Sequence, residues 1–167
     1  MSRRTQAIVG AAILLAAIGG LIWYTAAPEE RAITRRLDQF VAEFNASTRE
    51  GDGLASLARA ARLGQYFTQD VVVELGQGSP PIQGRETLMG MAARLQPRTA
   101  AFVLELDDVT VESVAAERAD VIMTALIRRR SFASGDESLD AREFSLEMRK
   151  EDGTWRMSRV VAVDTLR

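Results

Sequence analysis

The sequence predicts a single α+β domain preceded by one membrane-spanning helix. Apolar residues recur at helical spacing through the first half of the folded part, whereas the last third alternates with the period of two that is typical of strands. A charge-free run of 21 residues precedes both parts. The 140 residues that follow this run have the usual length of one domain with one hydrophobic core.

The charge-free run extends from Ala7 to Ala27. At about 1.5 Å per residue, a helix of that length covers the roughly 30 Å hydrocarbon core of a bilayer. Trp23 and Tyr24 lie near its end, and such rings settle at the membrane–water interface. We therefore expect a single-pass signal-anchor helix. A cleaved signal peptide is the alternative, since a positive start and a terminal Thr-Ala-Ala sequence imitate its regions.

The short N-terminal tail predicts the orientation. Residues 1–6 carry two arginines and the α-amino group, so this tail is easier to leave in the cytoplasm than to translocate. Arginines just after the span weaken the asymmetry, but large domains translocate largely regardless of charge. We expect a cytoplasmic tail, a transmembrane helix at 7–27 and an extracytoplasmic domain at 28–167, which would be periplasmic in a bacterium.

Three amphipathic helices are expected in the domain. Each carries its apolar residues on one side, and their predicted bounds are about Glu29 to Arg49, Leu54 to Leu63 and Arg85 to Leu95. Glycines end the first two helices and a proline ends the third.

Strands fill most of the remaining sequence. They are expected at Val71–Leu75, around Ile82, and at Phe102–Leu106, Val121–Ile127, Phe144–Met148 and Trp155–Val163. Turn residues separate the last three strands and predict consecutive antiparallel hairpins, so the expected order is ααββαββββ. Phe144, Leu146 and Met148 alternate with polar residues, which indicates that one sheet face is buried while the other is wet or contacts a partner.

Composition excludes several functional classes. The chain contains no cysteine and no histidine, so it lacks a thiolate nucleophile, a disulfide and the usual zinc ligands. We expect no metal site and no cofactor. The net charge is −2 and no long basic block occurs, which argues against nucleic-acid binding.

Several short motifs resemble the nuclear transport factor 2-like (NTF2-like) superfamily, which includes the SnoaL-like domains. They are Phe40–Asn45 in the first helix, Tyr66–Asp70 before the first strand, Ile82–Glu86 entering the third helix, and the closing Asp152-Gly153-Thr154-Trp155-Arg156-Met157. The resemblance covers about Ala32 to Leu166 and implies a cone of three helices packed on a curved antiparallel sheet.

The family includes isomerase-like and dehydratase-like enzymes, small-molecule binders and non-catalytic interaction domains, so the fold does not decide the function. In its isomerase-like members, an aspartate follows a Val-Glu pair and a tyrosine of the first helix donates to the oxyanion. The matching positions here are Leu75 and Phe40, which cannot do that chemistry. Asp38 and Asp70 are the remaining carboxylates near the pocket positions; Asp38 is expected on the helix edge in water, and Asp70 is expected at the end of a turn.

We expect any ligand to contact Arg159, Trp155, Phe40 and Tyr66. Arg159 shares the strand alternation of Trp155 and Met157, so it is expected on the buried face, where a guanidinium needs a partner. An anionic ligand or a structural ion pair would balance the charge of Arg159, and an exit of the strand to solvent would hydrate it. No catalytic residue is assigned.

The leading hypothesis is a membrane-anchored, non-catalytic interaction or assembly module. Its expected partners are the lipid bilayer and either a second copy or another membrane protein, met through the open face of the sheet. Binding of a small hydrophobic or anionic ligand in the cone is the second hypothesis, and a pocket enzyme of isomerase, dehydratase or hydrolase type is the third.

Overall fold

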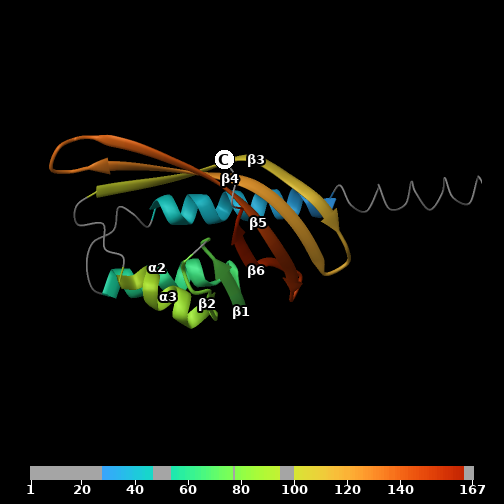
Figure 1. Cartoon of the computed structure of the whole chain (residues 1–167). Helices are drawn as coiled ribbons and strands as arrows, with labels where there is room; N and C mark the ends of the chain where they lie inside the picture. Colours follow the sequence, from blue (N-terminus) through green and yellow to red (C-terminus); the bar gives the residue numbers. More distant parts are fainter. Residues whose placement is uncertain (1–27, 47–53, 77, 95–99, 164–167) are drawn as a thin grey trace, which may run out of the picture.

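The computed structural model describes residues 28–46, 54–76, 78–94 and 100–163 (Figure 1). The predicted transmembrane segment, Ala7 to Ala27, lies outside these residues, as does the end of the first predicted helix. Among the helices that the structure describes, none is long and apolar enough to cross a membrane. The membrane span therefore stays a prediction.

The predicted order of elements, ααββαββββ, is confirmed. A first helix at 28–46 is followed by α2 (Leu54–Gly64), β1 (Phe67–Glu74), β2 (Ile82–Gln83), α3 (Arg85–Arg94), β3 (Ala100–Val114), β4 (Arg118–Ser131), β5 (Glu137–Glu151) and β6 (Thr154–Ala162). Strands β1, β3, β4 and β5 are longer than predicted, whereas β6 has the predicted length, shifted by one residue. Residues 67–70, expected to precede the first strand, belong to it.

The strands form one curved, mixed sheet in the order β2-β1-β6-β5-β4-β3. The prediction of a purely antiparallel sheet was wrong, because β6 lies between β5 and β1 and runs parallel to β1. Three successive hairpins set the direction of β6, whereas the crossover through α3 separates β1 from that meander. Local alternation does not encode this long-range pairing.

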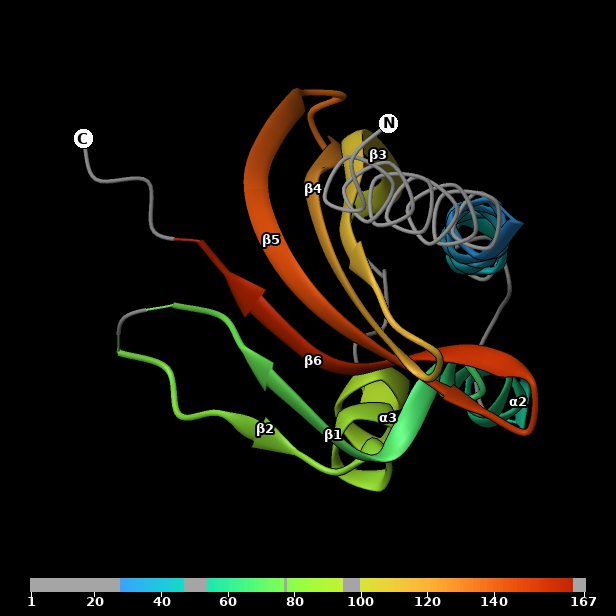
Figure 2. The same ribbon diagram turned by 90° about the vertical axis from the view of Figure 1, so that its right-hand side faces the viewer.

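All three helices lie on one side of the sheet (Figure 2). Ile33 and Leu37 of the first helix are fully buried there, at 0% and 1% exposure, against strand residues such as Leu146 and Met148. Burying a side chain of this size stabilises the fold by about 1.5–3 kcal/mol before chain entropy is counted. We call the opposite side of the sheet the outer face.

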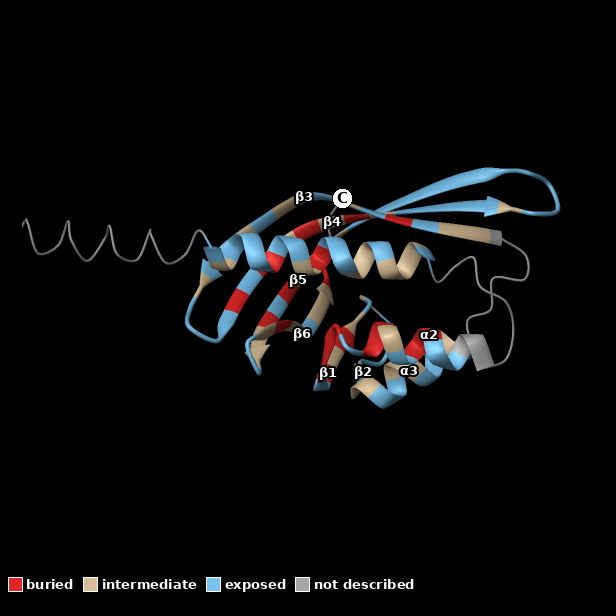
Figure 3. Ribbon diagram, turned by 180° about the vertical axis from the view of Figure 1, so that it is seen from behind, coloured by how far each residue is buried: buried red, intermediate tan, exposed pale blue. Residues whose placement is uncertain are grey.

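The β4–β5 hairpin extends beyond the helices as an arm, residues 127–142 (Figure 3). Every arm residue except Ser131 is exposed, on both faces of the ribbon. Phe132 and Leu139 keep 64% and 61% of their surface in water. The arm lies at the end of the molecule opposite to the start of the first helix (Figure 1).

The edge strand β3 is closed by a side chain. Asn45, near the end of the first helix, donates to the carbonyl of Leu104 and accepts from its amide, both at 2.8 Å. Farther along, the register shifts between Asp107 and Thr110, and Asp108 adopts a left-handed φ of 50°. The other edge, β2, has only two residues. Short, interrupted or covered edges prevent sheets from pairing edge to edge.

Candidate functional site

An aromatic cluster joins the first helix to β1. The ring of Phe40 lies edge-on to Tyr66 at 5.5 Å and to Phe67 at 5.7 Å, and a tilted contact links it to Phe44 at 6.3 Å. Tyr66 is buried, whereas Phe40 and Phe44 are half-buried. The structure therefore brings together two of the predicted ligand contacts, Phe40 and Tyr66.

Arg36 connects this cluster to the third predicted residue, Trp155. Its guanidinium stacks 4.0 Å above the centre of the Tyr66 ring, and it donates to the carbonyls of Trp155 at 3.2 Å and Gln65 at 2.8 Å. Burial lowers the pKa of Arg36 from its ordinary value. With its donors directed to backbone oxygens and its face on a ring, this arginine serves the fold.

Trp155 is buried at 3% exposure, as its motif predicted, and its indole fastens the sheet to the start of the first helix. Its Nε1 donates to Glu29 Oε2 at 2.9 Å, while Lys150 Nζ lies 2.7 Å from Glu29 Oε1. Hydrogen bonds from Lys150 and then Trp155 lower the pKa of the Glu29 carboxyl. We call these three side chains the latch.

Arg159 does not lie on the buried face, so that expectation was wrong. Met157 pairs with Met148, but Arg159 pairs with Glu147, so Ser158 forms a β-bulge that reverses the alternation. Val160 then packs against the core in place of Arg159.

On the outer face, Arg159 forms an exposed ion triad. Its guanidinium lies 2.7 Å from Glu74 and 3.5 Å from Glu147, and the hydrogen bond and charge of Glu74 raise its pKa. This is the structural ion pair that the sequence left open as an alternative to ligand binding.

The described interior contains no buried carboxylate. Its buried polar residues are Arg59 and Thr68. Asp38 is exposed, and so is Asp70, whose pKa is lowered by the neighbouring Thr68 side chain and by the hydrogen bond from Arg149 at 3.1 Å. Leu75, at the position of the family's catalytic base, follows β1 with 44% exposure. Within the described residues, no cluster of acidic side chains could hold a metal ion.

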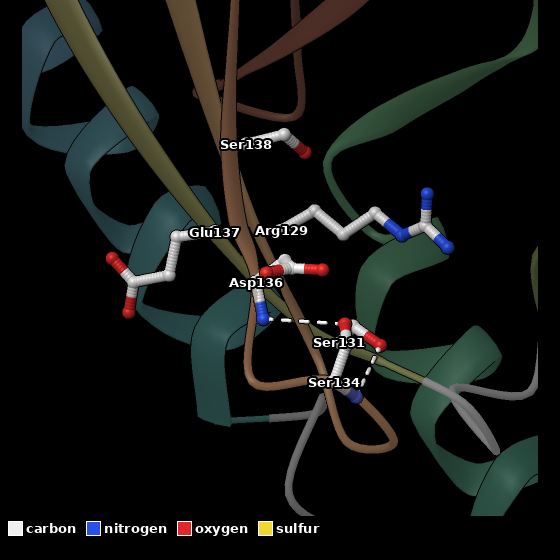
Figure 4. A pocket seen from close by; sticks show the side chains of 6 residues that line it. All are labelled: Arg129, Ser131, Ser134, Asp136, Glu137 and Ser138. Atoms are coloured by element: carbon white, nitrogen blue, oxygen red, sulfur yellow. Dashed lines mark hydrogen bonds between the residues drawn. The ribbon is translucent and has the colours of Figure 1, made fainter.

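An open hollow of about 320 Å³ lies at the tip of the arm. Six residues line it: Arg129, Ser131, Ser134, Asp136, Glu137 and Ser138 (Figure 4). None of the six is buried, and the Arg129 side chain extends away from the other five. Water screens such groups, so the hollow is a feature of the surface and not an enclosed site.

A family model for the SnoaL-like domain matches residues 53–161, which cover the strands and two of the helices described above. The chain belongs to the SnoaL-like domain family. Solved structures agree with this NTF2-like fold. No curated protein matches the sequence.

Two similar structures illustrate the relationship. A proposed scytalone dehydratase from Novosphingobium aromaticivorans is 17% identical, with a TM-score of 0.69 over 85% of this chain and 87% of that one. A ketosteroid isomerase-like protein from Erwinia carotovora atroseptica is 18% identical, with a TM-score of 0.58 over 83% and 98%. At such identities, the likeness of these SnoaL-like domains concerns the fold alone.

Sequence reasoning missed several residues that organise this SnoaL-like domain. Glu29 was predicted only as the start of the first helix, and Asn45 only as part of a family motif. Both contact strands more than 50 residues away in the chain. A local pattern therefore contained no signal for these contacts.

Proposed function

We infer that this SnoaL-like domain acts as a non-catalytic assembly module that binds protein through the outer face of its sheet. The observation that carries this proposal is the absence of any buried carboxylate among the described interior residues. The acid–base chemistry of the isomerase-like members uses an aspartate at the reacting atoms.

The closed sheet edges support the same proposal. Because Asn45 covers the edge at Leu104 and β2 is only two residues long, a partner gains little from adding a strand. The outer face remains accessible, and it includes half-buried apolar side chains such as Ile122 and Leu126. An exposed face with apolar residues between charged ones is typical of a protein contact.

Blue-native electrophoresis of detergent-extracted membranes tests this function in the full-length protein. We expect Ile122→Asp and Leu126→Asp on the outer face to convert a large complex into free protein. Thr87→Asp, which adds the same charge to the exposed side of α3, is the matched control and should leave the complex intact. A complex that survives both outer-face substitutions contradicts the proposal.

We also propose that residues 7–27 hold the domain at a membrane with the domain outside the cytoplasm. Residue 28, the first residue that the structure describes, is already helical, so almost no linker separates the domain from the predicted span. Protease added to spheroplasts should then digest the domain. A domain that faces the cytoplasm should be digested only after the spheroplasts are lysed. Full protection overturns the orientation.

Binding of a small apolar or anionic ligand is a second candidate, favoured by the inner side of the sheet. Phe40, Phe144 and Leu106 pack against the core but remain only half-buried. Arg142 lies two residues before Phe144 in β5, on the same inner side of the sheet. It donates to the carbonyl of Leu75 at 3.1 Å. An apolar lining with one charged group at its end suits an amphipathic anion.

Native mass spectrometry of the full chain tests this candidate. A bound adduct should be lost in Arg142→Ala and retained in Arg159→Ala, because Arg159 lies on the outer face. A clean apo mass speaks against ligand binding. The names of the similar structures favour the third candidate, a pocket enzyme, but the described interior lacks the acids that those reactions require.

A further inference from the structure

The β5 strand has an uncovered edge inside the arm, in addition to the closed edges at β3 and β2. Its pairing with β6 begins at Phe144, and just before it the amide of Val163 donates to the carbonyl of Glu143 at 2.9 Å. Over residues 137–142, β4 pairs with one side of β5, and no described strand lies on the other side. We call residues 137–142 the open edge.

The backbone groups of the open edge point in two directions. In an antiparallel sheet, the N–H and C=O groups of successive residues alternate between the two neighbouring strands. The carbonyl of Asp136 accepts from Ser131 of β4, whereas the carbonyl of Glu143 accepts from the opposite side. The even-numbered residues of the open edge therefore form hydrogen bonds with β4. The odd-numbered residues direct their N–H and C=O groups to the uncovered side: Glu137, Leu139 and Ala141.

The side chains along this edge are acidic and apolar. The stretch from Asp136 to Asp140 carries three carboxylates and no cation. Glu137 has one loose ion pair, at 3.8 Å from Arg130, and within the described residues no ion pair engages Asp140. Leu139 lies between these carboxylates with 61% of its surface in water. The open edge therefore matches a strand that carries positive charge around an apolar residue.

The hollow at the arm tip adjoins the open edge. Asp136, Glu137 and Ser138 line it, and the Arg129 side chain extends away from them (Figure 4). A basic side chain at the end of an added strand has room there, beside two carboxylates. The hollow and the open edge together form one continuous acidic surface.

We propose that the open edge binds an extended basic segment of a partner protein, which adds to β5 as an antiparallel strand. Every other residue of this segment forms hydrogen bonds with the three odd-numbered residues of the edge. Its apolar side chain lies beside Leu139 on the outer face, and its basic side chains lie beside Glu137 and Asp140. Backbone hydrogen bonds supply the affinity of such strand addition, and the side-chain pattern supplies its specificity.

The charge of the open edge decides which strand can add to it. Charged side chains along an edge oppose pairing between copies of one chain. The same carboxylates attract a strand of opposite charge, and they do so best at low salt because all of them are exposed. A basic segment of another protein therefore suits this edge better than a second copy of the chain.

A synthetic peptide tests the backbone contact with the full-length protein in detergent. The probe is fluorescein-labelled Gly-Thr-Arg-Val-Ser-Arg-amide, with its Val opposite Leu139, and fluorescence anisotropy measures its binding in low-salt buffer. N-methylation of the Val removes the N–H that faces Leu139 and should weaken binding about tenfold. N-methylation of the Ser removes an N–H that points away from β5, so this matched control should bind like the unmodified peptide.

Variants of the arm test the protein side of the same contact. Leu139→Pro removes an N–H on the uncovered side and should abolish binding, whereas Leu139→Val keeps that N–H and should retain it. Glu137→Lys combined with Asp140→Lys should weaken binding about tenfold. Glu112→Lys reverses an exposed charge near the other end of β3 and should have no effect. Circular dichroism checks that each variant is folded.

The proposal goes beyond the function of the outer face and does not rest on it. Ile122→Asp should therefore bind the peptide as the wild type does, whatever it does to the membrane complex. Equal binding of the two methylated peptides, or no binding of the unmodified one, overturns strand addition. Binding that survives the double lysine variant overturns the basic partner.

Discussion

The indole Nε1 of Trp155 donates a 2.9 Å hydrogen bond to Oε2 of Glu29, a residue 126 positions earlier in the chain. Lys150 binds the other oxygen of the same carboxylate, at 2.7 Å. The latch therefore ties the start of the first helix to the β5–β6 hairpin. Any force that reaches residue 28 from the N-terminal side is transmitted directly to the sheet.

Removal of the latch carboxylate should destabilise the domain. Glu29→Ala is expected to lower the free energy of unfolding by about 1 kcal/mol, since a charged hydrogen bond is lost from a partly exposed position. Urea denaturation measures this change. Glu30→Ala removes an exposed carboxylate from the same helix turn and controls for the helix dipole. An equal loss in both variants shows that the latch contributes nothing.

Acid should remove the same contribution. Lys150 and Trp155 lower the pKa of Glu29 below its ordinary value of 4.5, so the folded state binds fewer protons than the unfolded state near that pH. The stabilisation is present above the ordinary value and lost as pH falls through the lowered one. The difference in unfolding free energy between wild type and Glu29→Ala should be constant from pH 7 to 5 and should shrink as the pH falls below the ordinary value of 4.5. A difference that grows in acid contradicts this assignment.

Asn45→Ala should destabilise the domain through the edge of β3. It removes two 2.8 Å hydrogen bonds to Leu104, which together contribute about 1–3 kcal/mol. Thermal unfolding measures the loss, and light scattering should show more aggregation because the β3 edge is uncovered. Asn45→Asp keeps the acceptor and loses the donor, so its stability should fall between the two. Wild-type behaviour of Asn45→Ala would mean that the edge needs no cover.

Arg159→Ala should leave the melting temperature near that of wild type, because exposed ion pairs contribute little to stability. Trp155→Ala, four residues earlier on the same strand, should cost about 3–5 kcal/mol because it empties a core position. Calorimetry of both variants decides whether the two residues lie on opposite faces. A large loss of stability in Arg159→Ala contradicts the placement of Arg159 on the outer face.

The elements themselves could be predicted because each rests on local periodicity. Phe144, Leu146 and Met148 alternate with polar residues, and the structure places Leu146 and Met148 in the core. Turn residues likewise predicted the hairpins that join β4, β5 and β6. These signals depend only on neighbours a few residues away.

What could not be predicted depends on distant parts of the chain. The parallel contact of β1 with β6 joins strands about 90 residues apart, as in the pair of Phe67 with Met157. The exposure of the arm has only a partial local signal: Arg128, Arg129 and Arg130 place charge on both faces of β4, but Leu139 lies between polar residues as in a core strand. The parallel contact depends on the three hairpins and the crossover through α3, and the exposure of the arm depends on where the helices end above the sheet.

The β-bulge at Ser158 determines which face of the sheet each later residue of β6 occupies. Because Ser158 is the extra residue of the bulge, deleting it would leave strict alternation with Arg159 still on the outer face and Val160 still against the core. Substitutions at this position should be tolerated, because its side chain makes one hydrogen bond to the backbone of Glu147. Residue 158 can therefore vary, or be lost, without moving Arg159 or Val160 to the other face of the sheet.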